Sequence, residues 1–365
     1  MSLNTYVTLG RSGLRVSPFT LGTMTFGEDH GWGTSAQESN AILTAYLERG
    51  GNSIDTANIY TNGHSEKIVG DYFASRPGLR DRVVLGTKFF FNLYEGDPNG
   101  GGPGRKAIVQ QLENSLRRLQ TDYVDIYWLH NFDPTTPVEE TLRTLDDLVR
   151  DGKIRYVGFS DVPAWATAEA ATIARFRGWS PVTALQLEYS LLERTSEGEL
   201  LPMAQALGMG VMAWSPLKNG FLSGKYSSTT TGDVDTTRAH LVGRPTPSDY
   251  VVIDTLNDVA HEIGASSAAT ALAWVQSRTP ITSTPITSTL IGARRMDQFE
   301  ANLAALDVTF TDAQRAALEE VSAPTLNFPA VNNRTLARMA QFAGATVDGI
   351  PSALSPLLEA SPVRY

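Results

Sequence analysis

Short apolar runs alternate with longer segments whose apolar residues recur at helical spacing along most of this chain. The runs that we expect to be strands are residues 19–24, 52–57, 82–88, 123–130, 154–160, 182–188, 210–215 and 288–293. An amphipathic helical pattern follows each of them, such as 105–119 after 82–88. Repeated strand–helix units of this number predict an α/β protein with a closed (β/α)8 barrel, a TIM barrel, because each helix then covers the outer face of the sheet.

An open, doubly wound sheet is the alternative arrangement of such units. It would carry the pattern G-x-G-x-x-G after its first strand, and "FTLGTMTFG" at residues 19–27 does not contain it. The closed barrel is therefore preferred. Before the first strand, "YVTLGRSGLRVS" predicts an N-terminal β-hairpin that turns at Ser12 and Gly13 and covers the barrel floor.

Three further segments stand outside this alternation. Residues 217–246 are rich in Gly, Ser and Thr and predict a long loop after strand seven. Residues 323–365 are interrupted by prolines and predict a C-terminal tail over or beside the barrel. The tandem repeat "TPITSTPITST" at 279–289 contains one surplus five-residue unit, which is expected to loop out before Leu290, because a central strand rejects proline. We expect one catalytic domain over residues 1–365.

Composition narrows the class of protein. Of the 365 residues, 42% are hydrophobic, and the net charge of −9 is spread without a basic stripe, which argues against a nucleic-acid partner. The chain contains no cysteine, so disulfides, thiolate catalysis and cysteine metal sites are excluded, and we predict no metal site. We expect a cytoplasmic protein without a membrane partner, since the sequence shows neither a signal-peptide pattern nor an apolar run of membrane-spanning length. The oligomeric state stays open.

Polar residues stand at the ends of three successive predicted strands. Asp55, Lys88 and His130 occupy these positions, and Tyr60 follows five residues after Asp55. Adjacent strands lie about 5 Å apart, so these side chains are expected to converge at the carboxyl rim of the barrel. Each has an ordinary alternative explanation as a turn cap, a surface aromatic, a solvated lysine or a core histidine. Four such coincidences at one rim are less plausible than a catalytic site.

These four residue types suit the reduction of a carbonyl group. Hydride addition leaves an oxygen that needs a proton, and a tyrosine can supply it although its free pKa is about 10. A neighbouring lysine ammonium lowers that pKa, and an aspartate keeps the lysine charged. A neutral histidine can donate a hydrogen bond to the carbonyl oxygen. We therefore predict Asp55, Tyr60, Lys88 and His130 as catalytic residues.

Three segments around these residues resemble the aldo-keto reductase family. They are "GGNSIDTANIYTNGHSE", "LGTK" and "YWLHNFD", and the similarity covers roughly residues 5–322. The resemblance implies an NADPH-dependent reductase of aldehydes or ketones, reversible to alcohol oxidation, that binds NADP(H) across the barrel mouth and a small carbonyl substrate. It implies that Tyr60 is the acid, Lys88 tunes it, Asp55 pairs with Lys88, and His130 orients the carbonyl.

The same resemblance implies which residues hold the cofactor and the substrate. The nicotinamide is expected at Ser160, Asp161, Gln186 and Trp214, the pyrophosphate at Ser215, Leu217, Gly220 and Leu222, and the adenosine phosphate at Gly292, Arg294, Gln298 and Asn302. The rest of 217–246 is expected to cover the cofactor. The substrate is expected at Phe26, Trp32, Phe89, Asn131 and Phe132. The chain departs from the family pattern at Asp161, where many members have asparagine, and at Ala301, where a glutamate is common. A carboxylate accepts hydrogen bonds but cannot donate them.

Two alternative functions remain. The family resembles the beta subunits of potassium channels, which makes a nicotinamide-binding regulatory subunit one alternative. A Schiff-base aldolase using Lys88 is the other, although pairing with Asp55 would keep the amine charged and non-nucleophilic.

Overall fold

Eight parallel strands close into a barrel in which neighbours along the chain are neighbours in space. The computed structural model describes residues 2–229, 243–278, 286–360 and 363. The barrel strands are β3 (Phe19–Gly22), β4 (Ser53–Asp55), β5 (Val84–Phe89), β6 (Val124–Leu129), β7 (Ile154–Ser160), β8 (Val182–Glu188), β9 (Gly210–Trp214) and β10 (Ile286–Ile291). Strand β10 pairs with β3, Thr289 lying opposite Phe19, and this pairing closes the barrel. The predicted (β/α)8 fold is confirmed.

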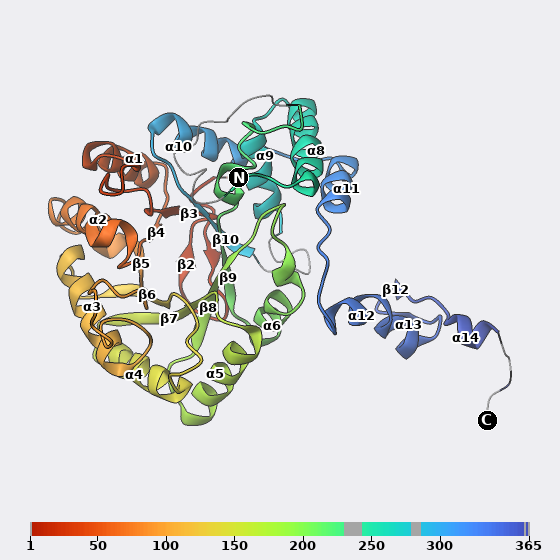
Figure 1. The fold of residues 1–365 in the computed structure, drawn as a ribbon, viewed down its shortest axis with the longest axis horizontal. Coiled ribbons are helices and arrows are strands. Elements are labelled where there is room, and N and C mark those ends of the chain that lie inside the picture. Colours follow the sequence, from red (N-terminus) through yellow and green to blue (C-terminus); the bar gives the residue numbers. More distant parts are fainter. Residues whose placement is uncertain (1, 230–242, 279–285, 361–362, 364–365) are drawn as a thin grey trace.

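Helices form a ring around the barrel (Figure 1). They are α1 (Ala36–Glu48), α2 (His64–Ala74), α3 (Arg105–Leu119), α4 (Val138–Arg150), α5 (Ala164–Arg177), α6 (Leu200–Leu207), α8 (Pro247–Ile263), α9 (Ser267–Gln276), α10 (Met296–Leu303) and α11 (Asp312–Val321). In α3, Ile108, Leu112 and Leu116 recur every fourth residue and are buried against the sheet. This helix has the bounds predicted from its pattern, whereas α11 was not predicted.

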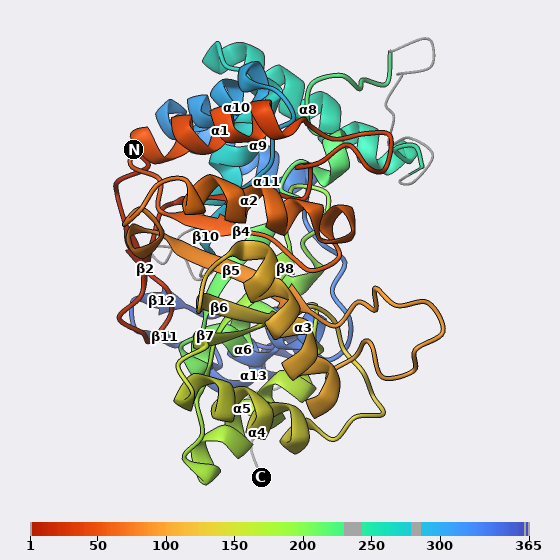
Figure 2. The ribbon, with the colours of Figure 1, turned by 90° about the vertical axis from the view of Figure 1, so that its left-hand side faces the viewer.

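The N-terminal hairpin closes the floor of the barrel. Its strands, β1 (Val7–Thr8) and β2 (Arg15–Val16), are antiparallel, and Leu9 between them is fully buried with the residues inside the barrel. A Cβ on Gly10 would lie 2.4 Å from the backbone nitrogen of Gly210, so only glycine permits this close approach to β9. Figure 2 shows β2 at one end of the barrel and the long loop between β5 and α3 at the other.

The C-terminal tail leads away from the barrel (Figure 1). It contains α12 (Ala330–Thr335), α13 (Ala337–Phe342), the strands β11 (Thr346–Val347) and β12 (Ile350–Pro351), and α14 (Pro356–Glu359). Phe328, at the start of this tail, is 76% exposed and does not close over the mouth. The tail therefore lies beside the barrel and not over it.

Two predicted loops fall partly outside the described residues. Residues 230–242 of the loop 217–246, and residues 279–285 of the repeat, are not described. Strand β10 begins at Ile286, two residues before the predicted 288, because Ile286 continues the ladder with β9. The amide of Ile286 donates to the carbonyl of Arg278 at 3.1 Å, so the residues on either side of 279–285 contact each other.

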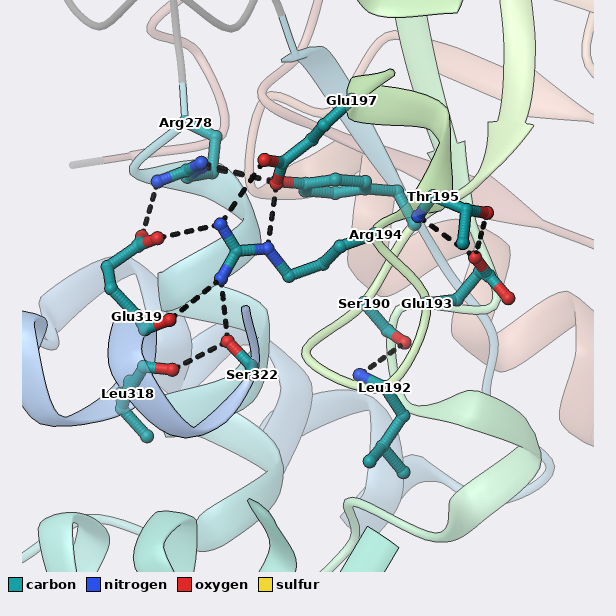
Figure 3. A network of polar contacts seen from close by, with 11 residues as sticks. Ser190, Leu192, Glu193, Arg194, Thr195, Glu197, Arg278, Leu318, Glu319 and Ser322 are labelled. Atoms are coloured by element: carbon teal, nitrogen blue, oxygen red, sulfur yellow. Dashed lines mark hydrogen bonds and ion pairs between the residues drawn. The ribbon is translucent and has the colours of Figure 1, made fainter. Parts of the chain in front are cut away.

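A buried polar network fastens α11 to the barrel (Figure 3). Arg194, which follows β8, donates to Glu197 at 2.7 Å, to Glu319 at 2.8 Å and to Ser322 at 2.7 Å. Arg278, beyond the end of α9, pairs with Glu197 and Glu319 as well. The side chains of Arg194 and Glu197 are only 5% and 6% exposed. Removing either one would leave the other as a buried charge without its main counter-charge, which destabilises the fold.

Replacement of Arg194 should therefore destabilise the fold strongly. We expect Arg194→Met to lower the free energy of unfolding by about 3–5 kcal/mol, because Glu197 would stay buried without its main partner. Urea denaturation followed by circular dichroism measures this change. Lys67→Met is the control, since Lys67 pairs with Asp71 on the surface and its loss should cost less than about 1 kcal/mol. Similar losses in the two variants would contradict this role of the network.

Candidate active site

The predicted catalytic residues lie together at the carboxyl ends of neighbouring strands. Asp55 is the last residue of β4, Lys88 lies near the end of β5, and His130 directly follows β6. Tyr60 begins the short 3-10 helix η1 (Tyr60–Gly63) after β4. The strand register thus brings four side chains from three successive units to one rim, as the sequence predicted.

Lys88 is the centre of this group. Its ammonium donates to the carboxylate of Asp55, to the carbonyl of Thr56 at 2.9 Å and to the hydroxyl of Tyr60 at 3.0 Å. Lys88 is fully buried and Asp55 is nearly so. The second oxygen of Asp55 accepts from Nε2 of Gln186 at 2.9 Å. Every ammonium hydrogen has an acceptor, so the lysine is held in one place and points at the phenol.

Burial and pairing decide the protonation states of this group. Burial lowers the pKa of Lys88, but Asp55 and Tyr60 together raise it above its ordinary value, so the amine stays charged. Burial raises the pKa of Asp55, and Lys88 opposes this effect. Burial also raises the pKa of Tyr60; Lys88 lowers it, as the sequence predicted, but burial outweighs this effect. The phenol is therefore neutral near pH 7, which is the form that can donate a proton.

His130 is a neutral imidazole beside this phenol. Burial lowers the pKa of His130 well below its ordinary value, and the charge of Lys88 lowers it further. Its ring packs edge-on against the ring of Tyr60, with centroids 6.1 Å apart, and against the ring of Phe91, with centroids 4.9 Å apart. Its Nδ1 is buried and has no hydrogen-bond partner among the described residues. The histidine can therefore polarise a carbonyl without carrying charge.

Strained backbone shapes the rim around these side chains. Thr61 and Asn62 have φ of 46° and 55°, and Phe90 has φ of 127°. Left-handed backbone costs about 1–3 kcal/mol for such residues and is characteristic of functional sites. The hydroxyl of Thr61 donates to the carbonyl of Phe26 at 2.7 Å and holds the turn after Tyr60.

The residues expected at the nicotinamide lie at the ends of β7, β8 and β9. Nε1 of Trp214 donates to Asp161 at 3.1 Å, and the hydroxyl of Ser160 donates to the same carboxylate at 3.2 Å. Gln186 points its amide nitrogen toward Asp55 instead. Asp161 is accessible to solvent at the mouth, yet protein surrounds it on most sides, and this burial raises the pKa of Asp161 to about 6.

The residues expected at the pyrophosphate form a tight turn after β9. Ser215 has φ of 52°, and the 3-10 helix η4 (Lys218–Gly220) follows it. The carbonyl of Leu217 accepts from the amides of Gly220 at 2.9 Å and Leu222 at 3.2 Å. Leu222 is fully buried and anchors the turn, so it offers backbone and not side-chain atoms to the mouth.

The residues expected at the adenosine phosphate hold the loop between β10 and α10. Nδ2 of Asn302 donates to the carbonyl of Gly292 at 3.0 Å. The side-chain oxygen of Gln298 accepts from the amide of Arg294 at 2.9 Å. The hydroxyl of Thr34 donates to the carbonyl of Arg294 at 2.6 Å. These contacts fix the backbone of Arg294, whose side chain is partly buried.

The structure differs from the expected substrate pocket at two positions. Phe26 and Phe89 are fully buried in the hydrophobic core, where Phe89 packs on Tyr127 with ring centroids 4.6 Å apart. They offer no surface to a substrate. Asn131 is exposed, and Trp32 is partly exposed.

Two aromatic residues at the mouth were not singled out from the sequence. Phe91 is 37% exposed and packs against His130, and Trp165 is 63% exposed and meets the partly exposed ring of Phe132 edge-on at 5.6 Å. Strand alternation along the run "FFF" at 89–91 would place Phe91 on the same face as the buried Phe89, so it does not predict Phe91 at the mouth. The reversed φ of Phe90, which decides its direction, has no sequence signal.

The comparisons with known proteins agree with this geometry. The sequence model of the Aldo/keto reductase family matches residues 18–323, and the chain belongs to this family. It is similar to the uncharacterized oxidoreductase YrpG of Bacillus subtilis, with 37% identity over 83% of this chain and 91% of the relative. It is also similar to norsolorinic acid reductase stcV of Emericella nidulans, with 34% identity over 87% and 81%. A putative voltage-gated potassium channel subunit beta of Schizosaccharomyces pombe shows 36% identity over 82% and 87%.

Within the described part of the chain, no three His, Asp or Glu side chains are placed to hold a metal ion together. No described helix is both long enough and apolar enough to cross a membrane.

The buried pair of Asp55 and Lys88 predicts non-additive effects on stability. Lys88→Met alone should cost about 3–5 kcal/mol of unfolding free energy, since the carboxylate of Asp55 would lose its counter-charge. Adding Asp55→Asn removes that buried charge, so the double variant should be more stable than Lys88→Met by at least about 1 kcal/mol. Denaturant unfolding of the parent, Lys88→Met, Asp55→Asn and the double variant in parallel gives the coupling energy. Additive losses would contradict a direct charge pair.

Proposed function

We propose that this chain is an NADPH-dependent reductase of aldehydes and ketones, reversible to alcohol oxidation. The hydrogen-bonded series of Asp55, Lys88 and Tyr60 beside the neutral His130 is the observation that supports it most strongly. Membership of the aldo/keto reductase family supports the reaction class, and relatives named as reductases agree with it.

The catalytic residues act on the carbonyl oxygen. A nicotinamide cofactor, when bound, supplies the hydride that adds to the carbonyl carbon. Tyr60 gives its hydroxyl proton to the oxygen that this addition leaves negative, and Lys88 stabilises the resulting phenolate. Asp55 keeps Lys88 charged and in position. His130, with its proton on Nε2, donates a hydrogen bond to the same oxygen.

The residues at the mouth suit a nicotinamide dinucleotide. Trp214 offers a partly exposed ring whose edge is fixed, and Ser160 lies beside it with a hydroxyl suited to a carboxamide. Gln186, tied to Asp55 through Nε2, has an amide oxygen that suits the carboxamide NH2. The turn containing Ser215, Leu217, Gly220 and Leu222 would hold the pyrophosphate. Such turns of left-handed residues bring backbone N–H groups together.

Arg294 would select NADP(H) by binding the 2′-phosphate. Arg294 lies shortly before α10 in the chain, and its backbone is fixed by Gln298 and Thr34. Gly292 and Asn302 shape the same loop. An arginine beside a helix N-terminus is well suited to a phosphate.

We propose that a small aromatic or aliphatic carbonyl compound binds between Trp32, Asn131 and Phe132. Phe91 and Trp165 complete this wall, and their exposed rings leave room for an apolar substituent. We also propose that residues 1–365 form one catalytic domain.

The two alternatives are less well supported. The relative named as a potassium channel subunit beta keeps a regulatory role open, but the four catalytic side chains are all present and in contact. A Schiff base would need a free lone pair on Lys88, whose ammonium is fully buried and donates to three acceptors.

The first test concerns the proton donor. Tyr60→Phe should reduce the turnover of a reactive aldehyde such as 4-nitrobenzaldehyde by at least about 100-fold, because only the hydroxyl is lost. NADPH oxidation followed at constant pH measures it, and NADPH affinity by fluorescence should stay unchanged. Tyr6→Phe is the control, since Tyr6 lies on the surface and bonds to Gly50. Activity above about a tenth of the parent's would remove Tyr60 from this role.

The second test concerns cofactor choice. Arg294→Ala should weaken NADPH binding by about 10- to 100-fold and leave NADH binding nearly unchanged, because only NADPH has a 2′-phosphate. Fluorescence titration with both nucleotides measures this difference. The adjacent Arg295, which pairs with Asp297, provides the control variant Arg295→Ala, for which little change is expected. An equal loss for both nucleotides in Arg294→Ala would refute the proposed contact.

A further inference from the structure

Asp161 is fixed at the mouth of the barrel from three sides. Its amide donates to the carbonyl of Gln186 at 3.3 Å. One carboxylate oxygen accepts from Nε1 of Trp214 at 3.1 Å, and the other accepts from the hydroxyl of Ser160 at 3.2 Å. Its φ of 54° is left-handed, a conformation that aspartate and asparagine tolerate better than most residues. The carboxylate therefore holds the edge of the indole.

The charge of Asp161 has no directly bonded cation among the described residues. Lys88 on β5 faces it and favours its ionised form, but that ammonium is already bonded to Asp55. Glu188 at the end of β8 disfavours the ionised form and is itself paired with Lys218 at 2.8 Å. The phenol of Tyr60 also faces Asp161 and is neutral. A net negative charge thus remains beside Trp214.

The two redox forms of a nicotinamide differ in charge. The oxidised ring is positive and the reduced ring is neutral, so a nearby carboxylate interacts with them differently. This step rests on the proposed function, in which the nicotinamide lies beside Trp214. We propose that Asp161 positions Trp214 and that its charge strengthens binding of the oxidised cofactor relative to the reduced one.

The proposal makes the preference dependent on pH. Burial raises the pKa of Asp161 to about 6, so the carboxyl is mainly charged at pH 7.5 and mainly neutral well below pH 6. The preference for the oxidised form should therefore weaken as the pH falls through this pKa. Both forms of NADP carry the same 2′-phosphate, so its titration cancels in the ratio of their affinities.

The variant Asp161→Asn removes the charge of the side chain but keeps its ability to position Trp214. The amide oxygen can still accept from Trp214, and asparagine tolerates the left-handed backbone. We measure the dissociation constants of NADP⁺ and NADPH by fluorescence titration between pH 5.5 and 7.5. At pH 7.5 the ratio Kd(NADP⁺)/Kd(NADPH) should rise about five- to tenfold in the variant. The ratio should vary with pH in the parent and stay flat in the variant.

Asp161→Gly tests the positioning of Trp214. Glycine suits the backbone but removes the acceptor of the indole N–H, so NADPH binding should weaken by about fivefold, whereas Asp161→Asn should keep it within about twofold of the parent. Glu188→Gln is the charge control, and its ratio should change by less than about twofold because Lys218 already neutralises Glu188.

Distinct outcomes would overturn distinct claims. An unchanged ratio in Asp161→Asn, or the same shift in Glu188→Gln, refutes the charge effect of Asp161. Equal NADPH affinity in Asp161→Asn and Asp161→Gly refutes its positioning of Trp214. Failure of the parent chain to bind either nucleotide would instead refute the proposed function.

Discussion

The buried ion pair between Lys88 and Asp55 is the constraint on which the mouth of this barrel depends. Two charges removed from water are tolerable only when each is paired and fully hydrogen-bonded, so β4 and β5 must hold the pair in register. The remaining ammonium hydrogens fix Tyr60 and the chain at Thr56. The free oxygen of Asp55 reaches Gln186 on β8. One hydrogen-bonded series thus joins the catalytic residues to the expected nicotinamide site.

Burial disfavours the charged form of each titratable side chain at the mouth, so it shifts their pKa values in different directions. It raises the pKa of Tyr60 and lowers the pKa of His130, so both side chains are neutral near pH 7. Lys88 is kept charged, because its interactions with the carboxylate of Asp55 and the hydroxyl of Tyr60 outweigh its desolvation. The sequence argument assigned the lysine the task of lowering the ground-state pKa of the phenol. In the structure Lys88 does lower this pKa, but burial outweighs the effect, so the lysine matters most once the proton has left and the phenolate needs a counter-charge.

Sequence patterns predicted those features that depend on local spacing or on strand order. The barrel, the helix 105–119 and the rim positions of Asp55, Lys88 and His130 follow from hydrophobic periodicity and from the geometry of parallel strands. The direction of a side chain beyond the end of a strand does not follow from them. In the run at 89–91, the backbone of Phe90 reverses its φ, which leaves Phe89 in the core and Phe91 at the mouth.

Polar contacts between residues far apart in the chain likewise could not be predicted from the sequence. Arg194 and Glu319 are separated by 125 positions, and nothing in either segment indicates that they meet. Their network holds α11 on the barrel wall, and the N-terminal hairpin closes the floor with Leu9. At the rim, Thr61, Phe90 and Asp161 have φ of 46°, 127° and 54°. Strain of about 1–3 kcal/mol per residue persists only where surrounding contacts hold the backbone. Here the hydroxyl of Thr61 donates to the carbonyl of Phe26, and the amide of Asp161 donates to the carbonyl of Gln186.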